Sequence, residues 1–208
     1  MSEGRQTTEG QQMNENSEVT GKTLEAVFLT GFMGSGKSTV GRRLARFLSL
    51  PFTDTDVRIE KQQGKSISDI FAQDGEEAFR RLETETLRDI GKEELCQVVS
   101  TGGGLPMREE NRRIMKEAGL VVFLRVRPET VYGRLQGDTT RPLLQRSDPQ
   151  AEIRRLLAER NPLYEAGADL IVDVDGRTPQ ELAEYIGAAC LAAEREGRTR
   201  SSACGTQS

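Results

Sequence analysis

The feature that most constrains the fold is a glycine-rich octapeptide between an apolar run and a helical pattern. Residues 31–38 are Gly-Phe-Met-Gly-Ser-Gly-Lys-Ser, which matches the phosphate-binding pattern G-x-x-x-x-G-K-[ST]. Residues 26–29 are apolar and predict a buried strand, and residues 40–48 predict the helix that the pattern requires. The glycines allow successive backbone N–H groups to face phosphate oxygens, and the helix adds its positive dipole end. The alternative is an ordinary glycine-rich turn.

The pattern predicts a site for ATP with Mg²⁺. The side chain of Lys37 is expected to reach the β- and γ-phosphates, and the hydroxyl of Ser38 is expected to bind Mg²⁺. The predicted nucleotide-binding residues of this loop are Gly34, Ser35, Gly36, Lys37, Ser38 and Thr39.

The rest of the chain predicts an α/β protein. The expected strands are residues 26–29, 51–54, 97–100, 120–124 and 170–172, and the helices are 40–48, 66–94 with a break near 74–75, 108–118, 128–135, 149–165 and 179–191. The strand segments are continuous apolar runs, which favour a parallel sheet covered on both faces. We therefore expect a three-layer α/β/α domain with a five-stranded parallel sheet, of the P-loop NTP hydrolase type.

The chain is expected to form one domain with a polar tail at each end. Its 208 residues suffice for one core. Residues 1–21 and 196–208 contain little to bury and predict disordered tails, so the domain is 22–195. Within it, the polar segment at about 136–148 predicts a mobile lid.

Composition excludes several kinds of site. There is no histidine, so a Ser-His-Asp triad and a histidine zinc site are impossible. Cys96, Cys190 and Cys204 are odd in number and widely spaced, which favours free thiols in a reducing cytosol. The net charge of -4 argues against a nucleic-acid binder that works by bulk charge. No apolar run approaches the length of a membrane span, so we expect a cytoplasmic protein.

Two features separate this chain from GTPases and motor ATPases. It has no Asn-Lys-x-Asp guanine reader, and its third strand ends in Ser100 rather than in an acid. The expected acids instead follow the second strand, where Asp54 can organise Mg²⁺ and Asp56 can accept a proton from a hydroxyl. The alternative is that Asp-Thr-Asp only caps the following helix. Asp173 is a second possible magnesium residue, although we interpret it as a strand-end carboxylate.

Three further groups of residues fit a kinase for a small acid. Arg80 and Glu83 lie on one helical face, although a surface ion pair is the alternative. Glycines 102–104 follow a strand and allow close backbone approach to a ligand, or form a plain loop. Arg141 in the polar segment can offset charge on the transferred phosphate, or be a solvated arginine.

Taken in order, these motifs resemble the shikimate kinase family over about residues 24–191. They are Gly-x-x-Gly-x-Gly-Lys-Ser at 31–38, Asp-Thr-Asp at 54–56, Phe-Arg-x-x-Glu at 79–83, Ser-Thr-Gly-Gly-Gly at 100–104, Arg-Pro-Leu at 141–143 and Arg-x-Pro-Leu-Tyr at 160–164. The resemblance implies transfer of the ATP γ-phosphate to the 3-hydroxyl of shikimate, within aromatic amino acid biosynthesis. It also suggests a monomer.

The resemblance further implies roles for the acceptor-site residues. Asp56 would bind shikimate hydroxyls and act as the base, while Arg80 and Arg160 would clamp the carboxylate, which suits the planar guanidinium fork. Gly102 and Gly103 would offer backbone groups to the substrate. Glu83 would orient Arg80.

The nucleotide-site residues follow from the same resemblance. Ser38 would bind Mg²⁺, and Asp54 would act on the ion. Arg141 would be the lid arginine, while Arg134 would stack on adenine and Arg177 would line the other side of the base. Two alternatives remain: another hydroxy-acid kinase, such as a gluconate kinase-like enzyme, and a nucleotide-binding regulator that has lost catalysis.

Overall fold

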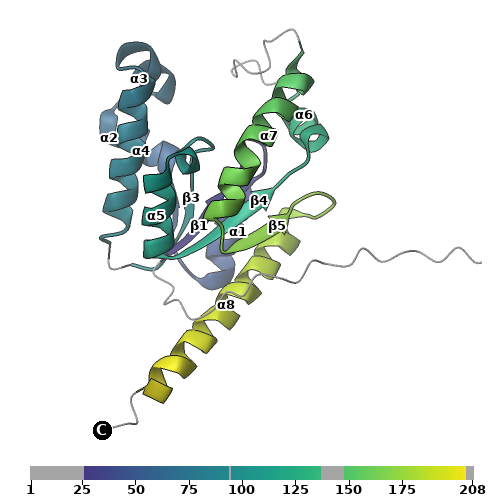
Figure 1. The fold of residues 1–208 in the computed structure, drawn as a ribbon. Helices are drawn as coiled ribbons and strands as arrows, with labels where there is room; N and C mark the ends of the chain where they lie inside the picture. The colour runs from purple at the N-terminus through teal and green to yellow at the C-terminus, as the bar shows by residue number, and fades with distance from the viewer. Residues whose placement is uncertain (1–25, 94, 137–147, 205–208) are drawn as a thin grey trace, which may run out of the picture.

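A five-stranded parallel sheet forms the centre of the computed structural model, which describes residues 26–93, 95–136 and 148–204 (Figure 1). Its strands are β1 (Ala26–Thr30), β2 (Phe52–Asp54), β3 (Gln97–Ser100), β4 (Leu120–Arg125) and β5 (Leu170–Asp173). Their order across the sheet is β2-β3-β1-β4-β5, and every pair is parallel. The predicted α/β fold with five parallel strands is confirmed.

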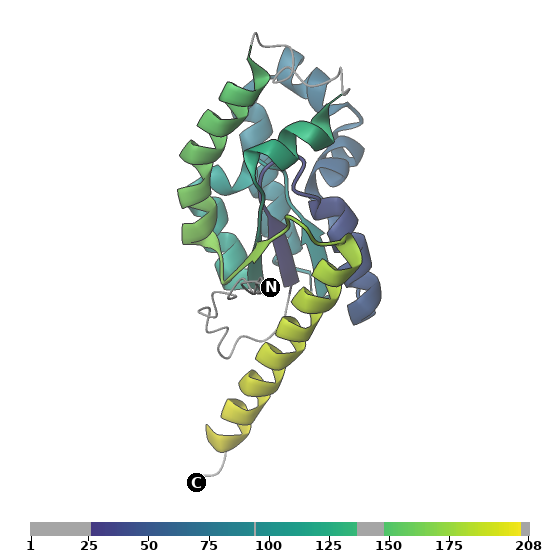
Figure 2. The same cartoon turned by 90° about the vertical axis from the view of Figure 1, so that its right-hand side faces the viewer.

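Helices cover both faces of this sheet. They are α1 (Lys37–Leu48), α2 (Thr55–Gln63), α3 (Ile67–Gln73), α4 (Glu76–Ile90), the 3₁₀ helix η1 (Leu105–Met107), α5 (Glu109–Ala118), α6 (Pro128–Leu135), α7 (Pro149–Gly167) and α8 (Pro179–Cys204). Figure 2 shows α7 on one side of the sheet and α1 with α8 on the other. Strand β1 is buried along its whole length, which explains its continuous apolar sequence.

Successive residues of β1 point into two different hydrophobic clusters. Val27 and Leu29 pack in a cluster with residues of α1 and α8, whereas Phe28 packs with residues of α4 and α5. This alternation follows from the two-residue period of a strand. Both faces of the strand are therefore apolar, because both are covered by helices.

The helices differ from the sequence prediction at two places. Helix α2 begins at Thr55, and the side chain of Asp54 is its N-cap, accepting a hydrogen bond from the backbone N–H of Asp56. The last helix was expected to end at residue 191, but α8 continues to Cys204 and includes residues 196–204 of the expected tail. The run Ala-Ala-Glu-Arg-Glu at 192–196 consists of strong helix formers, which favours continuation of the helix past residue 191.

The topology places a crevice beside β1. The chain leaves β1 for β2 on one side of it, whereas β4 and β5 lie on the other side. Ligands of open α/β sheets bind at such a switch point, at the carboxyl ends of the strands. The glycine-rich loop follows β1 at this position. Most of the expected lid, residues 137–147, lies outside the described residues, as do residues 1–21. No helix in the described ranges is long and apolar enough to cross a membrane.

Candidate nucleotide and acceptor cleft

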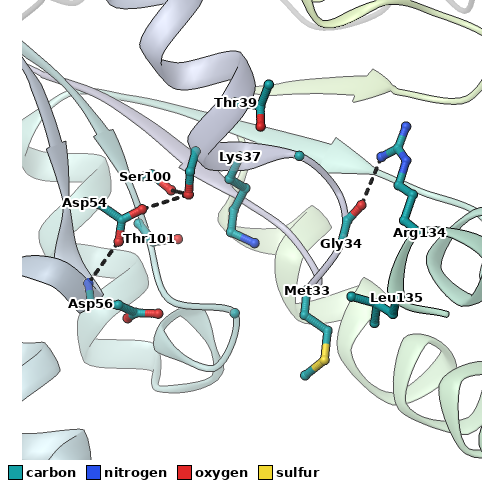
Figure 3. Close-up of a pocket in the computed structure, with 13 residues that line it drawn as sticks. Met33, Gly34, Lys37, Thr39, Asp54, Asp56, Ser100, Thr101, Arg134 and Leu135 are labelled. Atoms are coloured by element: carbon teal, nitrogen blue, oxygen red, sulfur yellow. Dashed lines mark hydrogen bonds between the residues drawn. The ribbon is translucent and has the colours of Figure 1, made fainter. Parts of the chain in front are cut away.

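A cavity of about 350 Å³ opens at the carboxyl ends of β1, β2 and β3 (Figure 3). Its lining residues come from the glycine-rich loop, from the ends of β2 and β3, and from α6. Those with functional side chains are Lys37, Ser38, Thr39, Asp54, Asp56, Ser100, Thr101 and Arg134. The fold therefore brings residues from Met33 to Leu135 together around one cavity.

The glycine-rich loop is shaped around its lysine. Gly36, the N-cap of α1, has a φ of 95°, a conformation that glycine adopts without strain. The ammonium group of Lys37 donates hydrogen bonds to the carbonyl oxygens of Gly31 at 2.8 Å and Phe32 at 3.0 Å. In Figure 3 the Lys37 side chain extends between the loop and the Asp54 side of the cavity. A phosphate in the loop would therefore meet a fixed positive charge.

The Ser38 hydroxyl lies between two oxygen groups. It donates a hydrogen bond to Asp54 Oδ2 at 2.7 Å, and its oxygen lies 3.2 Å from Ser100 Oγ. A hydroxyl and a carboxylate are oxygen ligands of the kind Mg²⁺ prefers, and nucleotide-bound Mg²⁺ takes its other ligands from phosphates and water. Within the described ranges no group of three or more His, Cys, Asp or Glu side chains gathers to bind a metal. The donor set at Ser38 and Asp54 thus fits Mg²⁺ brought in with a nucleotide.

The carboxylates of Asp56 and Glu83 converge on Gly102, and Glu83 is buried. A Cβ atom on Gly102 would lie 2.6 Å from Asp56 Oδ1 and 2.9 Å from Glu83 Oε1, so a larger residue here would displace these carboxylates. Among the described residues neither of these oxygens has a hydrogen-bond partner. Burial, reinforced by the charge of Asp54, raises the pKa of Asp56. Burial also raises the pKa of Glu83 from 4.5 to about 7, against the opposing effect of Arg80.

Arg80 is held by two acids above the glycine triplet. Its guanidinium group donates to Glu83 Oε2 at 2.8 Å and to Glu76 Oε1 at 2.9 Å. A Cβ atom on Gly104 would lie 2.8 Å from Arg80 Cζ, so this glycine makes room for the guanidinium group. Because Glu83 is only 1% exposed, the surface ion pair that the sequence left open is wrong. The sequence had suggested that the glycine triplet approaches a ligand, but not that Gly104 makes room for Arg80.

Helix α7 brings Arg160 and Tyr164 to the same region. The guanidinium group of Arg160 lies over the Phe32 ring, 5.7 Å from its centre. The hydroxyl of Tyr164 donates to the carbonyl oxygen of Gly103 at 2.5 Å. Burial raises the pKa of Tyr164 to about 12, although the positive charges of Arg160 and Arg80 oppose this. Arg80 thus lies against the glycine triplet, and Arg160 lies beside Tyr164, whose hydroxyl bonds to that triplet.

A second cavity, of about 200 Å³, adjoins the loop on the side of α8. Gly36, Thr39, Arg134 and Arg177 are among its lining residues. Arg134 donates a hydrogen bond to the carbonyl oxygen of Gly34 at 2.9 Å. The two arginines that the sequence assigned to the adenine base thus line one hollow next to the phosphate loop.

The remaining residues singled out in the sequence are Arg141, Asp173 and the cysteines. Arg141 lies outside the described residues. Asp173 lines neither cavity described above and instead accepts hydrogen bonds from Arg125 at 2.6 and 2.8 Å, an interaction that lowers the pKa of Asp173. This agrees with its interpretation as a strand-end carboxylate. Cys96 and Cys190 are free thiols, as expected.

The sequence showed Ser100 as a missing acid and as the first residue of the Ser-Thr-Gly-Gly-Gly motif, and it assigned no role to this side chain. The pairing of β3 with β1 and β2 brings the buried Ser100 hydroxyl beside Ser38 and Asp54, and no local sequence pattern shows that pairing.

Comparison with known proteins gives one consistent family. The family model described as shikimate kinase matches residues 33–191. The chain is 42% identical over 163 residues to the shikimate kinase of Thermodesulfovibrio yellowstonii, covering 78% of this chain and 93% of that protein. It is 46% identical over 164 residues to the shikimate kinase of Persephonella marina, covering 78% and 97%.

Solved structures agree with the sequence matches. The structure of Acinetobacter baumannii shikimate kinase in complex with shikimate has a TM-score of 0.76 at 38% identity, covering 82% of this chain and 94% of that one. A gluconokinase from Sinorhizobium meliloti has a TM-score of 0.56 at 17% identity, which shows a shared fold alone.

Proposed function

The chain belongs to the shikimate kinase family and is an ATP-dependent phosphotransferase, and we propose that its cleft phosphorylates the 3-hydroxyl of shikimate with the residues described above. The observation that supports these roles is a single cavity lined by the phosphate loop, by Asp54 and Asp56, and by Gly103. Next to it, Glu83 lies against Gly102 and Arg80 lies against Gly104. A small hydroxylated acid needs a cation at its carboxylate and a base at its hydroxyl.

The nucleotide would occupy both cavities. The backbone of the loop at 34–36 and the ammonium group of Lys37 bind its phosphates, with Thr39 at the start of α1. The base would lie in the smaller cavity between Arg134 and Arg177. Arg141 would contact the transferred phosphate.

Magnesium would be held by Ser38 directly and by Asp54. The bound ion would supply positive charge to the phosphate oxygens. Asp54 accepts a hydrogen bond from the Ser38 hydroxyl, so a lone pair of the serine oxygen is available for a metal.

The acceptor site would lie at the glycine triplet. Arg80 and Arg160 bind the shikimate carboxylate, and Gly102 and Gly103 provide backbone contacts. Asp56 accepts the proton of the 3-hydroxyl as the new bond from that oxygen to the γ-phosphorus forms. The bond from the γ-phosphorus to the β-phosphate oxygen breaks, and ADP leaves.

The working form would be a cytoplasmic monomer. This follows from the resemblance to the family, which suggests a monomer.

A coupled assay of ADP release with a panel of hydroxy acids tests the proposal. We expect ADP release that depends on shikimate and on Mg²⁺. Release with gluconate but not with shikimate would favour the gluconate kinase-like alternative. Nucleotide binding without release for any acid would indicate a regulator that has lost catalysis.

A further inference from the structure

Strand β3 ends in a buried serine at the position where GTPases and motor ATPases carry an acid. Ser100 is 1% exposed, and in the sheet it is the register partner of Asp54 on β2. Neighbouring strands are about 4.8 Å apart, so these two side chains flank the same part of the cavity. An acid at position 100 would therefore stand beside the carboxylate of Asp54, and two adjacent carboxylates repel one another.

The hydrogen bonds around Ser38 determine what the Ser100 hydroxyl does. A serine hydroxyl has one proton and two acceptor lone pairs. The proton of Ser38 is committed to Asp54 Oδ2 at 2.7 Å. In the 3.2 Å contact between the two serine oxygens, Ser100 must then be the donor. Figure 3 shows Ser100 and Asp54 on the same side of the cavity, across from Arg134.

These two hydrogen bonds leave one lone pair of the Ser38 oxygen unused. Its proton is held by Asp54, and one lone pair accepts the Ser100 proton. We propose that Ser100 is a positioning residue which, together with Asp54, leaves a single Ser38 lone pair directed at the magnesium ion of the bound nucleotide. The inference rests on the proposed role of Ser38 as a metal ligand.

The binding of Mn²⁺, a paramagnetic substitute for Mg²⁺, measures this role without turnover. Electron paramagnetic resonance titrations give the Mn²⁺ affinity of the complex with ADP, and calorimetry gives the affinity for ADP without metal. We expect Ser100→Ala to weaken Mn²⁺ binding about tenfold, the usual effect of removing a group that orients a metal ligand. Its affinity for metal-free ADP should remain that of the unchanged protein. Ser100→Thr, which keeps the hydroxyl, should restore Mn²⁺ binding.

The matched control is Thr30→Val. Thr30 is a buried hydroxyl at the end of β1 that donates to the carbonyl oxygen of Val122 and lies outside the proposed site. The Thr30→Val substitution should leave Mn²⁺ binding unchanged. A loss of Mn²⁺ affinity in this control equal to that in Ser100→Ala would overturn the inference. Normal Mn²⁺ binding by the Ser100→Ala protein would also overturn the inference. An equal loss of its affinities for Mn²⁺ and for metal-free ADP would overturn it as well.

Two further variants keep the outcomes distinct. Ser38→Ala tests the metal ligand itself: if it binds Mn²⁺ normally, the proposed metal site is wrong. If Ser38→Ala weakens Mn²⁺ binding and Ser100→Ala does not, only the role of Ser100 is refuted. Should Ser100→Ala fail to fold, Ser100→Cys replaces it, because a thiol donates weakly. The same loss of Mn²⁺ affinity is expected, and normal binding would refute the role.

Discussion

The buried carboxyl of Glu83 should make the free energy of unfolding fall as the pH rises. Its pKa is 4.5 in the unfolded chain and about 7 in the folded protein, because burial disfavours the charge. Below about pH 4.5 the group is protonated in both states. As the pH rises toward 7 the unfolded chain releases this proton while the folded protein retains it, so stability present at low pH is lost.

The size of the effect follows from the shift. One pKa unit corresponds to about 1.4 kcal/mol, so the full loss is about 3 kcal/mol. About 2 kcal/mol of this falls between about pH 5.5 and about pH 8. Glu83 is 1% exposed, so solvent screening does not reduce the figure much.

The variant Glu83→Gln isolates this contribution. Glutamine does not ionise, so the unfolding free energy of the variant relative to that of the unchanged protein should rise by about 2 kcal/mol over this pH range. Any pH-independent cost of losing the charged partner of Arg80 cancels in the comparison. Urea unfolding followed by far-ultraviolet circular dichroism measures it, since the chain has no tryptophan.

Asp173 provides a control, because its pKa is lowered whereas that of Glu83 is raised. The pKa of Asp173 is lowered by its hydrogen bond to Arg125, so its contribution to stability is lost only as the pH falls below about 4. Asp173→Asn should therefore show a constant difference between about pH 5.5 and about pH 8. A Glu83→Gln difference that is equally constant, or that falls with pH, would refute the reasoning.

Three other substitutions test the acceptor site. Asp56→Asn should lower kcat at least about a hundredfold, the usual worth of a general base, while ATP still binds; near-normal turnover would remove Asp56 from that role. Arg80→Ala should raise the KM for shikimate at least about tenfold by removing a charged hydrogen bond, and an unchanged KM would contradict the carboxylate clamp. Tyr164→Phe removes the hydrogen bond to the Gly103 carbonyl and should lower the unfolding free energy by about 1 kcal/mol, measured by urea unfolding; unchanged stability would show that the bond contributes nothing.

Local sequence patterns were sufficient for the phosphate loop and for the strands. The glycine spacing and Lys37 depend on short-range backbone geometry, and each apolar run reports burial of its own strand. The same patterns could not fix the length of α8, because helix ends depend on weak propensities that continue past the core.

Asp54 has two roles that the local sequence pattern could offer only as alternatives. The sequence offered helix capping and magnesium binding as alternatives. In the structure Asp54 Oδ1 accepts the N–H of Asp56 while Oδ2 accepts the Ser38 hydroxyl, so one carboxylate performs the capping and still faces the predicted metal site. The two oxygens of a carboxylate have separate partners, which only three-dimensional coordinates distinguish.

By itself, then, the sequence determined the parallel α/β fold, the nucleotide loop and the family. Only the tertiary structure decided that Glu83 is buried against Gly102 and that Ser100 contacts Ser38. The physical reason is that burial and hydrogen bonding between strands depend on which segments become neighbours. That choice is made by the packing of the whole sheet, in which β3 lies between β1 and β2.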